Sequence, residues 1–399
     1  MTDVILDISR LISRLRYSTP SGVDRVEMAY ARGLLAHYGD ALAFAAVHPT
    51  GLYGRIGRAA ALDYLDELER RWANEADAPR QRSLPSVLPR LAALLPSRAA
   101  PRAPGSIYVQ ASPSHLTRPA QMRRILAREQ ARFLCLVHDL IPIEFPEYAR
   151  PSGAALHRRR IETIAGLADG VIVYSQATLR SLQPWLDRSG RGANVHVAKL
   201  GTDTFEVGPA AAGQGDDRPY FVCLGTIEPR KNHLLLLHLW RHLAETLPAA
   251  DVPRLLVIGR RGWENEQVID MLERCPALQG HVEELGGCPD ARMAALVRGA
   301  HALLMPTFVE GYGLPVAEAL AVGTPVICSD LPVLREVGGA APDYRDPLDG
   351  PGWKAAVLDH AARGPLHRAQ LARLPQWHKP TWAEHIAVVA EAVEALRGG

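Results

Sequence analysis

Short apolar runs alternate with helical patterns along much of the chain. Runs such as VILDIS (4–9), FLCLVHD (133–139) and GVIVYS (170–175) each have the length of one strand. Between such runs lie segments with helical spacing, for example DRVEMAYARGLLAHYG, which is predicted to stop at Gly39. Continuous apolar strands separated by helices are typical of a parallel sheet with helices on both faces. The pattern therefore predicts an α/β fold of the doubly wound type.

The chain is long enough for two such domains, and a polar, Gly-rich break divides it. We predict an N-terminal domain at 1–206, a linker at 207–218 and a C-terminal domain at 219–378. A last helix at 379–399 could pack on either domain, including back on the first. A Pro-, Ala- and Arg-rich segment at 76–106 is predicted to be an exposed insertion. Two doubly wound halves would face a central cleft, and open sheets of this kind bind ligands beyond the carboxyl ends of their strands.

Composition narrows the possible partners and location. The chain has 45 Lys and Arg residues against 43 Asp and Glu, a formal net charge of +2, so no nucleic acid is expected as a partner. Its five cysteines are scattered without a C-x-x-C pair, which indicates buried thiols in a reducing compartment. No apolar run approaches the roughly 20 residues that span a bilayer, and the sequence does not open on a secretory leader. We therefore expect a cytoplasmic protein.

The stretch PTFVEGYGLPVAEALAVGTPVICSD (306–330) carries the clearest candidate chemistry. It places Glu310 and Glu318 on either side of a glycine turn. Gly311 and Gly313 let the backbone come close to a ligand, and N–H groups at the start of the following helix would face it. Carboxylates at this edge could accept hydrogen bonds from the hydroxyls of a sugar or ribose. The alternative is that both glutamates only cap and solubilise a helix start.

The helix after this turn is predicted from its end signals. Pro315 suits the first helical position, because its missing N–H would have no helical partner there. Gly323 suits a left-handed residue at the other end. Glu318 would then lie in or near the first turn, where the helix dipole favours a negative charge.

Five segments in sequence order resemble one enzyme family. EGYGLPVAEALAVGTPV resembles the E-x7-E motif of retaining nucleotide-sugar glycosyltransferases of glycosyltransferase family 4, which have the GT-B fold. LGTIEPRKN (224–232) resembles the phosphate-binding segment of that family, and HDLIP, LGTD and VIGRRGW fit in register. HDLIP with GTIEPRKN is most similar to bacterial mannosyltransferases that build O-antigen and exopolysaccharide chains. The resemblance implies a GT-B fold of two Rossmann-like domains and transfer of a hexose, with retention, onto a growing bacterial surface glycan.

The resemblance also implies roles for single residues. Negative charge grows on the leaving diphosphate, and Lys231 is the best candidate to stabilise it. Many family members have an arginine where this chain has Thr226, so we hypothesise that Arg230 supplies the missing cation. Glu310 would bind hydroxyls of the transferred sugar and Glu318 the ribose. The implied donor-binding set is Gly22, Thr226, Arg230, Lys231, Glu310, Gly311, Tyr312, Gly313, Leu314 and Glu318.

The N-terminal half contributes a smaller set of candidates. His138 ends a predicted strand where the family uses a histidine near the reacting face of the sugar, so it joins Lys231, Arg230 and Glu310 as a catalytic candidate. Asp139 could orient that histidine or contact the acceptor, and both alternatives stay open.

The expected donor is GDP-mannose, with UDP-glucose and a deoxysugar nucleotide such as GDP-rhamnose as alternatives. The expected acceptor is a glycan or a lipid-linked oligosaccharide. No D-x-D triplet is present, so no metal and no further cofactor are expected. HRRR (157–160) and arginines of the insertion could hold the protein against an anionic membrane at its inner face, although both could equally be solvated surfaces. Those insertion residues are Arg80, Arg82, Arg90, Arg98 and Arg102.

Rival functions remain on sequence grounds. A dinucleotide oxidoreductase would share the alternation, but the first strand is not followed by G-x-G-x-x-G. A non-catalytic module that binds sugar nucleotides or glycans could carry the same residues. A GT-B epimerase or phosphorylase would differ in whether its activity needs an acceptor glycan.

Overall fold

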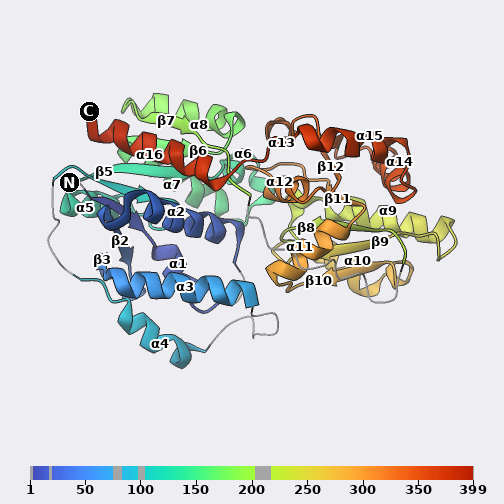
Figure 1. Ribbon diagram of the computed structural model, residues 1–399, viewed down its shortest axis with the longest axis horizontal. Coiled ribbons are helices and arrows are strands. Elements are labelled where there is room, and N and C mark those ends of the chain that lie inside the picture. Colours follow the sequence, from blue (N-terminus) through green and yellow to red (C-terminus); the bar gives the residue numbers. More distant parts are fainter. Residues whose placement is uncertain (1–2, 18–19, 75–82, 98–103, 203–216, 399) are drawn as a thin grey trace. The chain divides into compact units, whose positions relative to one another are not determined.

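The structure is a computed structural model that describes residues 3–17, 20–74, 83–97, 104–202 and 217–398 (Figure 1). The chain divides into two units. The first consists of Met1–Glu144, Pro151–Gly201 and Thr381–Gly399, and the second of Phe145–Arg150 and Thr202–Pro380. The second unit thus includes a short segment from the middle of the expected N-terminal domain, and the last helix belongs to the first unit. Most of the predicted linker lies outside the described residues.

The first unit contains a seven-stranded sheet in the order β3-β2-β1-β4-β5-β6-β7. Neighbouring strands are parallel except β2 and β3. The sequence pattern did not predict β3 and β7, because these edge strands bury fewer residues and so lack a continuous apolar run. The strands are β1 (Val4–Asp7), β2 (Leu42–Val47), β3 (Tyr53–Ile56), β4 (Ser106–Gln110), β5 (Ala131–Val137), β6 (Gly170–Val173) and β7 (Asn194–Val197).

Helices cover both faces of this first sheet. Apolar residues of α5, α7 and α8 form the main core with one face. On the opposite face α16 approaches the sheet at Gly170, where a Cβ would lie 3.3 Å from Leu396 Cδ1. His385 of α16 also lies within 2.9 Å of the Tyr30 hydroxyl of α2. The helices are α1 (Ser9–Ser13), α2 (Gly22–Tyr38), α3 (Arg58–Asn74), α4 (Leu84–Ala93), α5 (Pro119–Glu129), α6 (Ile141–Glu144), α7 (Gly153–Leu167), α8 (Gln176–Ser189) and α16 (Trp382–Gly398).

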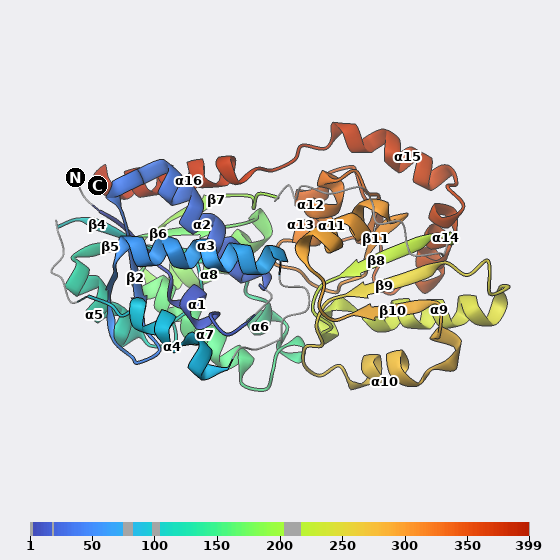
Figure 2. The same ribbon diagram turned by 60° about the horizontal axis from the view of Figure 1, so that its bottom comes forward.

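The second unit contains a six-stranded parallel sheet in the order β10-β9-β8-β11-β12-β13. Its strands are β8 (Tyr220–Leu224), β9 (Arg254–Ile258), β10 (Val282–Leu285), β11 (Ala302–Met305), β12 (Val326–Ser329) and β13 (Asp343–Arg345). Its helices are α9 (His233–Thr246), α10 (Glu266–Arg274), α11 (Asp290–Gly299), α12 (Leu314–Ala321), α13 (Pro332–Gly338), α14 (Gly350–Ala361) and α15 (Pro365–Arg373). Figure 2 shows α9 and α10 on one face and α11 and α12 on the other. Trp240 of α9 and Trp353 of α14 are fully buried in the core.

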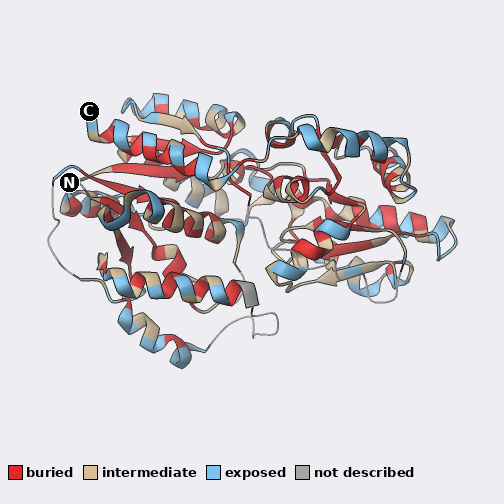
Figure 3. Cartoon of the chain, in the orientation of Figure 1, coloured by how far each residue is buried: buried red, intermediate tan, exposed pale blue. Residues whose placement is uncertain are grey.

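Both sheets have the topology expected of doubly wound domains. The strand order reverses between β1 and β4 in the first sheet and between β8 and β11 in the second. In parallel sheets the loops that follow neighbouring strands meet at the carboxyl edge, and a reversal of order opens a crevice there. The strands themselves are largely buried (Figure 3). The loops after β8 and β11 are therefore the expected position of a ligand site in the second unit.

The described part of the predicted insertion contains one helix, α4. It exposes Leu88 to 56%, and the following turn exposes Leu95 to 49%, while Arg90 pairs with Glu67 of α3 at 2.6 Å. The remaining arginines of the insertion, Arg80, Arg82, Arg98 and Arg102, lie outside the described residues. Among the helices of the described chain, none combines the length and the apolar character needed to cross a membrane.

Candidate functional site

The loops after β8 and β11 bring two predicted cations onto one predicted carboxylate. Lys231 Nζ donates a hydrogen bond to Glu310 Oε1 at 2.6 Å, and Arg230 Nη1 donates to the same oxygen at 2.8 Å. Their close approach follows from the pairing of β8 with β11 as adjacent parallel strands. Three of the four catalytic candidates are thus in direct contact within the second unit.

Backbone and side-chain hydrogen bonds fix the loop after β8. Lys231 ends a short 3₁₀ turn, η3 (Pro229–Lys231), and Asn232 follows in the left-handed conformation with φ 55°. The Asn232 side chain donates to Pro306 O at 3.1 Å and to Pro347 O at 3.0 Å. The N–H of Phe308 donates to Arg230 O at 2.8 Å. The two loops therefore hold each other, which places both cations before any ligand arrives.

A second carboxylate, which sequence reasoning did not select, completes the cluster. Glu228 Oε1 lies 2.6 Å from Arg230 Nη2, so both terminal nitrogens of Arg230 face carboxylates. Glu228 stands in the quoted LGTIEPRKN segment, three residues before Lys231, but this spacing alone does not indicate that its side chain pairs with Arg230. The four side chains carry two positive and two negative charges, so the cluster is formally neutral.

The two carboxyl groups of this cluster respond differently to their surroundings. Burial alone would raise the pKa of Glu310, but the charges and hydrogen bonds of Arg230 and Lys231 outweigh it and lower the pKa to about 2. Burial also raises the pKa of Glu228, and there it exceeds the opposing effect of Arg230. Glu310 is consequently ionised at any physiological pH.

Glu310 keeps one oxygen for a ligand. Its described contacts all converge on Oε1, which also lies 3.1 Å from the Thr307 hydroxyl. Oε2 has no hydrogen-bond partner among the residues that the structure describes. A carboxylate that is held through one oxygen and open at the other can accept a hydrogen bond from a ligand hydroxyl without changing its position.

Lys231 also retains hydrogen-bonding capacity. An ammonium has three N–H donors, and within the described chain its only hydrogen-bond partner is Glu310. Gly225 lies beside it: a Cβ at that position would be 3.6 Å from Lys231 Nζ. The next residue, Thr226, also belongs to the loop between β8 and η3 and carries no charge. Among the described residues, no group of three or more His, Cys, Asp or Glu side chains could hold a metal ion.

The glycine turn before α12 requires glycine at one position. Gly313 has φ 99°, and a Cβ there would lie 2.5 Å from Leu334 Cδ2. Tyr312 is buried, and Gly311 and Leu314 are partly exposed. A larger residue at position 313 would be strained by its backbone and would collide with α13.

The start of α12 differs from the sequence prediction. Because the left-handed residue is Gly313, the helix begins at Leu314, and Pro315 is its second residue rather than its first. Glu318 is the fifth residue and lies just past the first turn, near it as predicted, where the effect of the N-terminal dipole is weaker. Gly323 does adopt the predicted left-handed conformation, with φ 80°.

Aromatic side chains that sequence reasoning missed border the loop of Glu310. The rings of Phe308 and Tyr148 are parallel to within 1°, with centroids 5.8 Å apart. Trp263 donates its indole N–H to Tyr148 O at 3.2 Å. These contacts attach the 145–150 segment to the second unit.

His138 occupies the predicted strand end in the first unit, with both ring nitrogens engaged. Nε2 donates to Ala111 O at 2.8 Å, so Nδ1 accepts the hydrogen bond of the Tyr174 hydroxyl. Burial is the main cause that lowers the pKa of His138 to about 4. Asp139 accepts the N–H of Ile141 at 3.0 Å with its side chain. The carboxylate of Asp139 therefore binds the first N–H of α6, and the described hydrogen bonds do not link it to the imidazole.

Gly22 is the first residue of α2, whose N-terminus is already capped. Ser21 accepts the N–H of Asp24, and Asp24 accepts the N–H of Ser21, which forms a capping box. Arg10 Nε lies 2.7 Å from Asp24, and Arg14 Nε lies 3.0 Å from it. The backbone start of this helix thus stands among two arginines and one buried carboxylate.

Comparisons with known proteins assign a family to part of the chain. Residues 207–341 match the family model Glycosyl transferases group 1. A 141-residue segment is 37% identical to the O-antigen chain mannosyltransferase B of Escherichia coli and covers 35% of this chain and 36% of that protein. A 231-residue segment is 26% identical to the Escherichia coli serotype-specific mannosyltransferase WbdA, over 53% of this chain and 27% of WbdA. A third, of 175 residues, is 30% identical to the phosphatidyl-myo-inositol mannosyltransferase of Mycolicibacterium smegmatis, over 43% of each. The matches thus span less than half the length of these curated relatives, and the second unit carries a glycosyl transferases group 1 domain.

Solved structures resemble the chain over its whole length. Sucrose-phosphate synthase from Thermosynechococcus elongatus has a TM-score of 0.64 at 15% identity, with all of both chains covered. HepE of Anabaena, solved with UDP-glucose, has a TM-score of 0.57 at 13% identity and covers 100% of this chain and 98% of its own. At such identities the likeness concerns the fold alone. The predicted fold class, GT-B with two Rossmann-like α/β domains, is confirmed.

Proposed function

We propose that this chain transfers a hexose from a nucleotide sugar to a glycan acceptor, with retention of configuration at the sugar. The proposal rests on the hydrogen bonds around the carboxylate of Glu310. One of its oxygens is fixed by two cations, and the other is open beside a lysine with unused donors. A sugar hydroxyl and a diphosphate need acceptors and donors placed together in this way.

The donor fits the second unit as follows. Glu310 Oε2 accepts a hydroxyl of the transferred sugar, and the two remaining N–H donors of Lys231 bind the diphosphate. As the bond to the sugar breaks, negative charge grows on the leaving phosphate, and a preorganised cation stabilises that charge most. Gly311, Tyr312, Gly313 and Leu314 bring backbone groups to the sugar. Glu318, one turn into α12, is assigned to the ribose.

Arg230 is proposed to act with Lys231 in place of the arginine that the family often has at the position of Thr226. Its two terminal nitrogens already face Glu228 and Glu310. Its positive charge can therefore stabilise the diphosphate from a distance without any rearrangement. Arg230 can bind a phosphate oxygen directly only by releasing one carboxylate. Donor affinity in Arg230→Ala and Lys231→Ala separates these roles: intact affinity in the first with loss in the second assigns Arg230 to positioning.

The first unit supplies the residues proposed to meet the acceptor and the reacting face of the sugar. His138 is neutral above pH 5, because its pKa is about 4. It would act there as a hydrogen-bonding group rather than as a cation. Gly22 at the start of α2 is proposed to approach the diphosphate. The departing phosphate would deprotonate the acceptor hydroxyl, which suits a site whose only described histidine candidate is already engaged at both nitrogens.

GDP-mannose is the proposed donor, supported by curated relatives that are named as mannosyltransferases. UDP-glucose and a deoxysugar nucleotide are the alternatives. The proposed acceptor is a bacterial surface glycan or its lipid-linked precursor, used at the inner face of the cytoplasmic membrane. We propose that no metal is required, because Arg230 and Lys231 supply the positive charge. Loss of transfer in EDTA with recovery in magnesium would count against this part.

A nucleotide panel followed by a transfer assay tests the proposal. A nucleotide at 100 times its Kd should stabilise the chain by about 2.7 kcal/mol, which a thermal-shift measurement detects. Lys231→Ala should lower kcat/KM for transfer by roughly 100- to 1000-fold, the range found on removing one such donor. Lys354→Ala is the control, because its Nζ lies 2.9 Å from His242, away from Glu310. Equal activity in Lys231→Ala refutes the mechanism, and donor binding without any transfer supports a non-catalytic module.

A further inference from the structure

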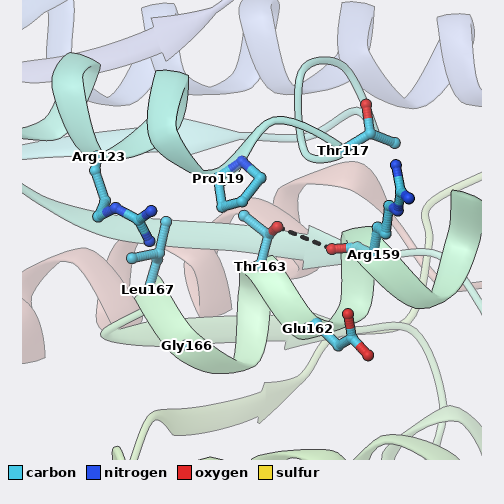
Figure 4. Close-up of a pocket in the computed structure, with 8 residues that line it drawn as sticks. All are labelled: Thr117, Pro119, Arg123, Arg159, Glu162, Thr163, Gly166 and Leu167. Carbon is cyan, nitrogen blue, oxygen red and sulfur yellow. Dashed lines mark hydrogen bonds between the residues drawn. The ribbon is translucent and has the colours of Figure 1, made fainter.

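A groove between α5 and α7 on the first unit has the features of an anion site. Its volume is about 390 Å³. Figure 4 shows Arg123 of α5 and Arg159 of α7 at opposite sides of it, with Pro119 and Thr163 between them. None of these residues belongs to the set assigned to the donor.

The two arginines differ from their neighbours in having no partner. Arg124 donates to Ala120 O at 3.3 Å, and the guanidinium of Arg158 lies over the Trp185 ring at 5.3 Å. Within the described chain, Arg123 and Arg159 have no side-chain hydrogen bond or ion pair, and both are exposed. Their hydrogen-bond donors are therefore available to a ligand in the groove.

The surroundings add to the positive character of the groove. α5 and α7 each carry three arginines and one glutamate. The glutamate of α5, Glu129, is buried and lies 3.0 Å from Arg55, so it does not face the groove cations. α5 also begins at Pro119 with no side-chain cap and no acidic residue in its first turn, so no carboxylate of that turn offsets the positive end of its dipole.

The groove is hollow partly because α7 has glycine at position 166. A Cβ built on Gly166 would meet nothing within 4 Å. This residue lines the groove and has no positive φ, so a larger side chain can be introduced without backbone strain. The groove can therefore be filled without changing any charge.

We propose that this groove binds a phosphate or diphosphate group between Arg123 and Arg159. Guanidinium groups present paired donors that match phosphate oxygens, and two of them facing one space can hold the group from both sides. Glu162 also lines the groove and has no partner in the described chain. Its carboxylate opposes anion binding, so its removal should strengthen the site. The group could belong to the headgroup of a lipid or to a free phosphorylated compound.

Calorimetric titration of the full chain with pyrophosphate tests the site. Arg123→Ala and Arg159→Ala should each weaken binding by about tenfold or more, as expected for charge-assisted hydrogen bonds. Gly166→Leu should abolish binding by filling the space, and Glu162→Gln should tighten it severalfold. Arg124→Ala and Arg158→Ala are matched controls that remove the same charge from the adjacent position of the same helix, and they should change affinity less than about twofold.

Vesicles distinguish the two sources of the phosphate. Phosphatidylcholine vesicles that contain farnesyl diphosphate should bind the wild-type chain but not Gly166→Leu if the ligand is a lipid headgroup. Pyrophosphate binding without recruitment to these vesicles identifies a free phosphate compound. Equal losses in all four arginine variants, or unchanged binding in Gly166→Leu, would show diffuse surface attraction and overturn the site. GDP thermal shifts on the same variants should stay unchanged, so a failure here is separate from a failure of the proposed donor site.

Discussion

The two units each bury charged groups near the carboxyl ends of their strands, but they neutralise them differently. In the second unit Glu228 and Glu310 face Arg230 and Lys231 at distances of 2.6–2.8 Å, and the charges cancel. In the first unit Glu27 of α2 is fully buried, and neither of its oxygens has a hydrogen-bond partner in the described chain. Arginine is close by, but Arg10 and Arg14 both pair with Asp24 instead.

This difference indicates which of the two buried carboxyl groups stays ionised. Burial is the main cause that raises the pKa of Glu27 well above its usual value, and Asp7 raises it further. Burial thus favours the neutral form of Glu27, whereas paired cations keep Glu310 ionised. A carboxylate that is ionised and fixed can accept hydrogen bonds from a polar ligand without reorganisation, whereas Glu27 is fully buried and out of reach of a ligand. The contrast supports placing the donor chemistry at Glu310.

Removing Glu310 should have the largest effect on stability. Glu310→Ala removes the shared partner of the buried Lys231 and the partly buried Arg230, and we expect the free energy of unfolding to fall by about 3–5 kcal/mol at pH 7. Because its folded pKa is depressed to about 2, the contribution of Glu310 is present above its unfolded value of 4.5 and is lost as the pH falls toward 2. Denaturant unfolding at pH 7 and pH 3 should therefore show a smaller difference between variant and wild type at the lower pH.

Glu384→Ala provides the comparison for that measurement. Glu384 accepts the N–H of Thr381 at an exposed helix start, so its loss should cost about 1 kcal/mol, as for a helix cap. A Glu310→Ala effect no larger than this, or one that does not shrink at low pH, would show that the cations do not depend on Glu310.

Much of the second-unit site followed from sequence because strand ends fix backbone positions. Lys231 and Glu310 follow strands whose apolar runs are unambiguous, and adjacent parallel strands bring their ends together. The partner choice of Arg230 was beyond prediction, since Glu228 and Glu310 are reached through side-chain torsions that no spacing encodes. The start of α12 was missed by one residue because Gly313 caps the helix in the left-handed conformation, so that Leu314 rather than Pro315 is the first helical residue.

Other differences from prediction arise from long-range packing. The 145–150 segment belongs to the second unit because Tyr148 stacks on Phe308, which lies 160 positions later in the chain. The edge strand β13 is only three residues long and is mostly not fully buried, so the sequence contains no apolar run that would predict it. In the first unit the sequence did not predict that Glu27 is buried, because the pattern of apolar residues in α2 indicates only one buried face of the helix.

Replacing Glu27 should have an intermediate effect of opposite sign. Glu27→Leu removes an unsatisfied buried carboxyl, and we expect the free energy of unfolding at pH 7 to rise by about 1–3 kcal/mol. Because the folded pKa is raised, wild type loses stability as the pH increases above the unfolded value of 4.5, and the variant lacks this loss. The gain should therefore grow between pH 4 and pH 7 in denaturant unfolding. Glu391→Leu, at an exposed position of α16, should show no such growth, and a destabilised Glu27→Leu chain would mean that the carboxylate is paired.

The smallest expected effect separates the geometry of Arg230 from its charge. Arg230→Lys keeps one positive charge, but a single ammonium cannot reproduce the fork that reaches Glu228 through Nη2 and Glu310 through Nη1. We expect a loss of about 1 kcal/mol in unfolding free energy and a severalfold rise in donor KM at nearly constant kcat, because Lys231 still faces the leaving phosphate. Arg261→Lys is the matched control, since Arg261 spans Glu273 and Glu284 in the same manner with its side chain 40% exposed. It should change stability by less than about 0.5 kcal/mol. A fall in kcat as large as that of Lys231→Ala would instead place Arg230 on the phosphate itself in the transition state, and the neutral cluster would then be a resting arrangement that opens when the donor binds.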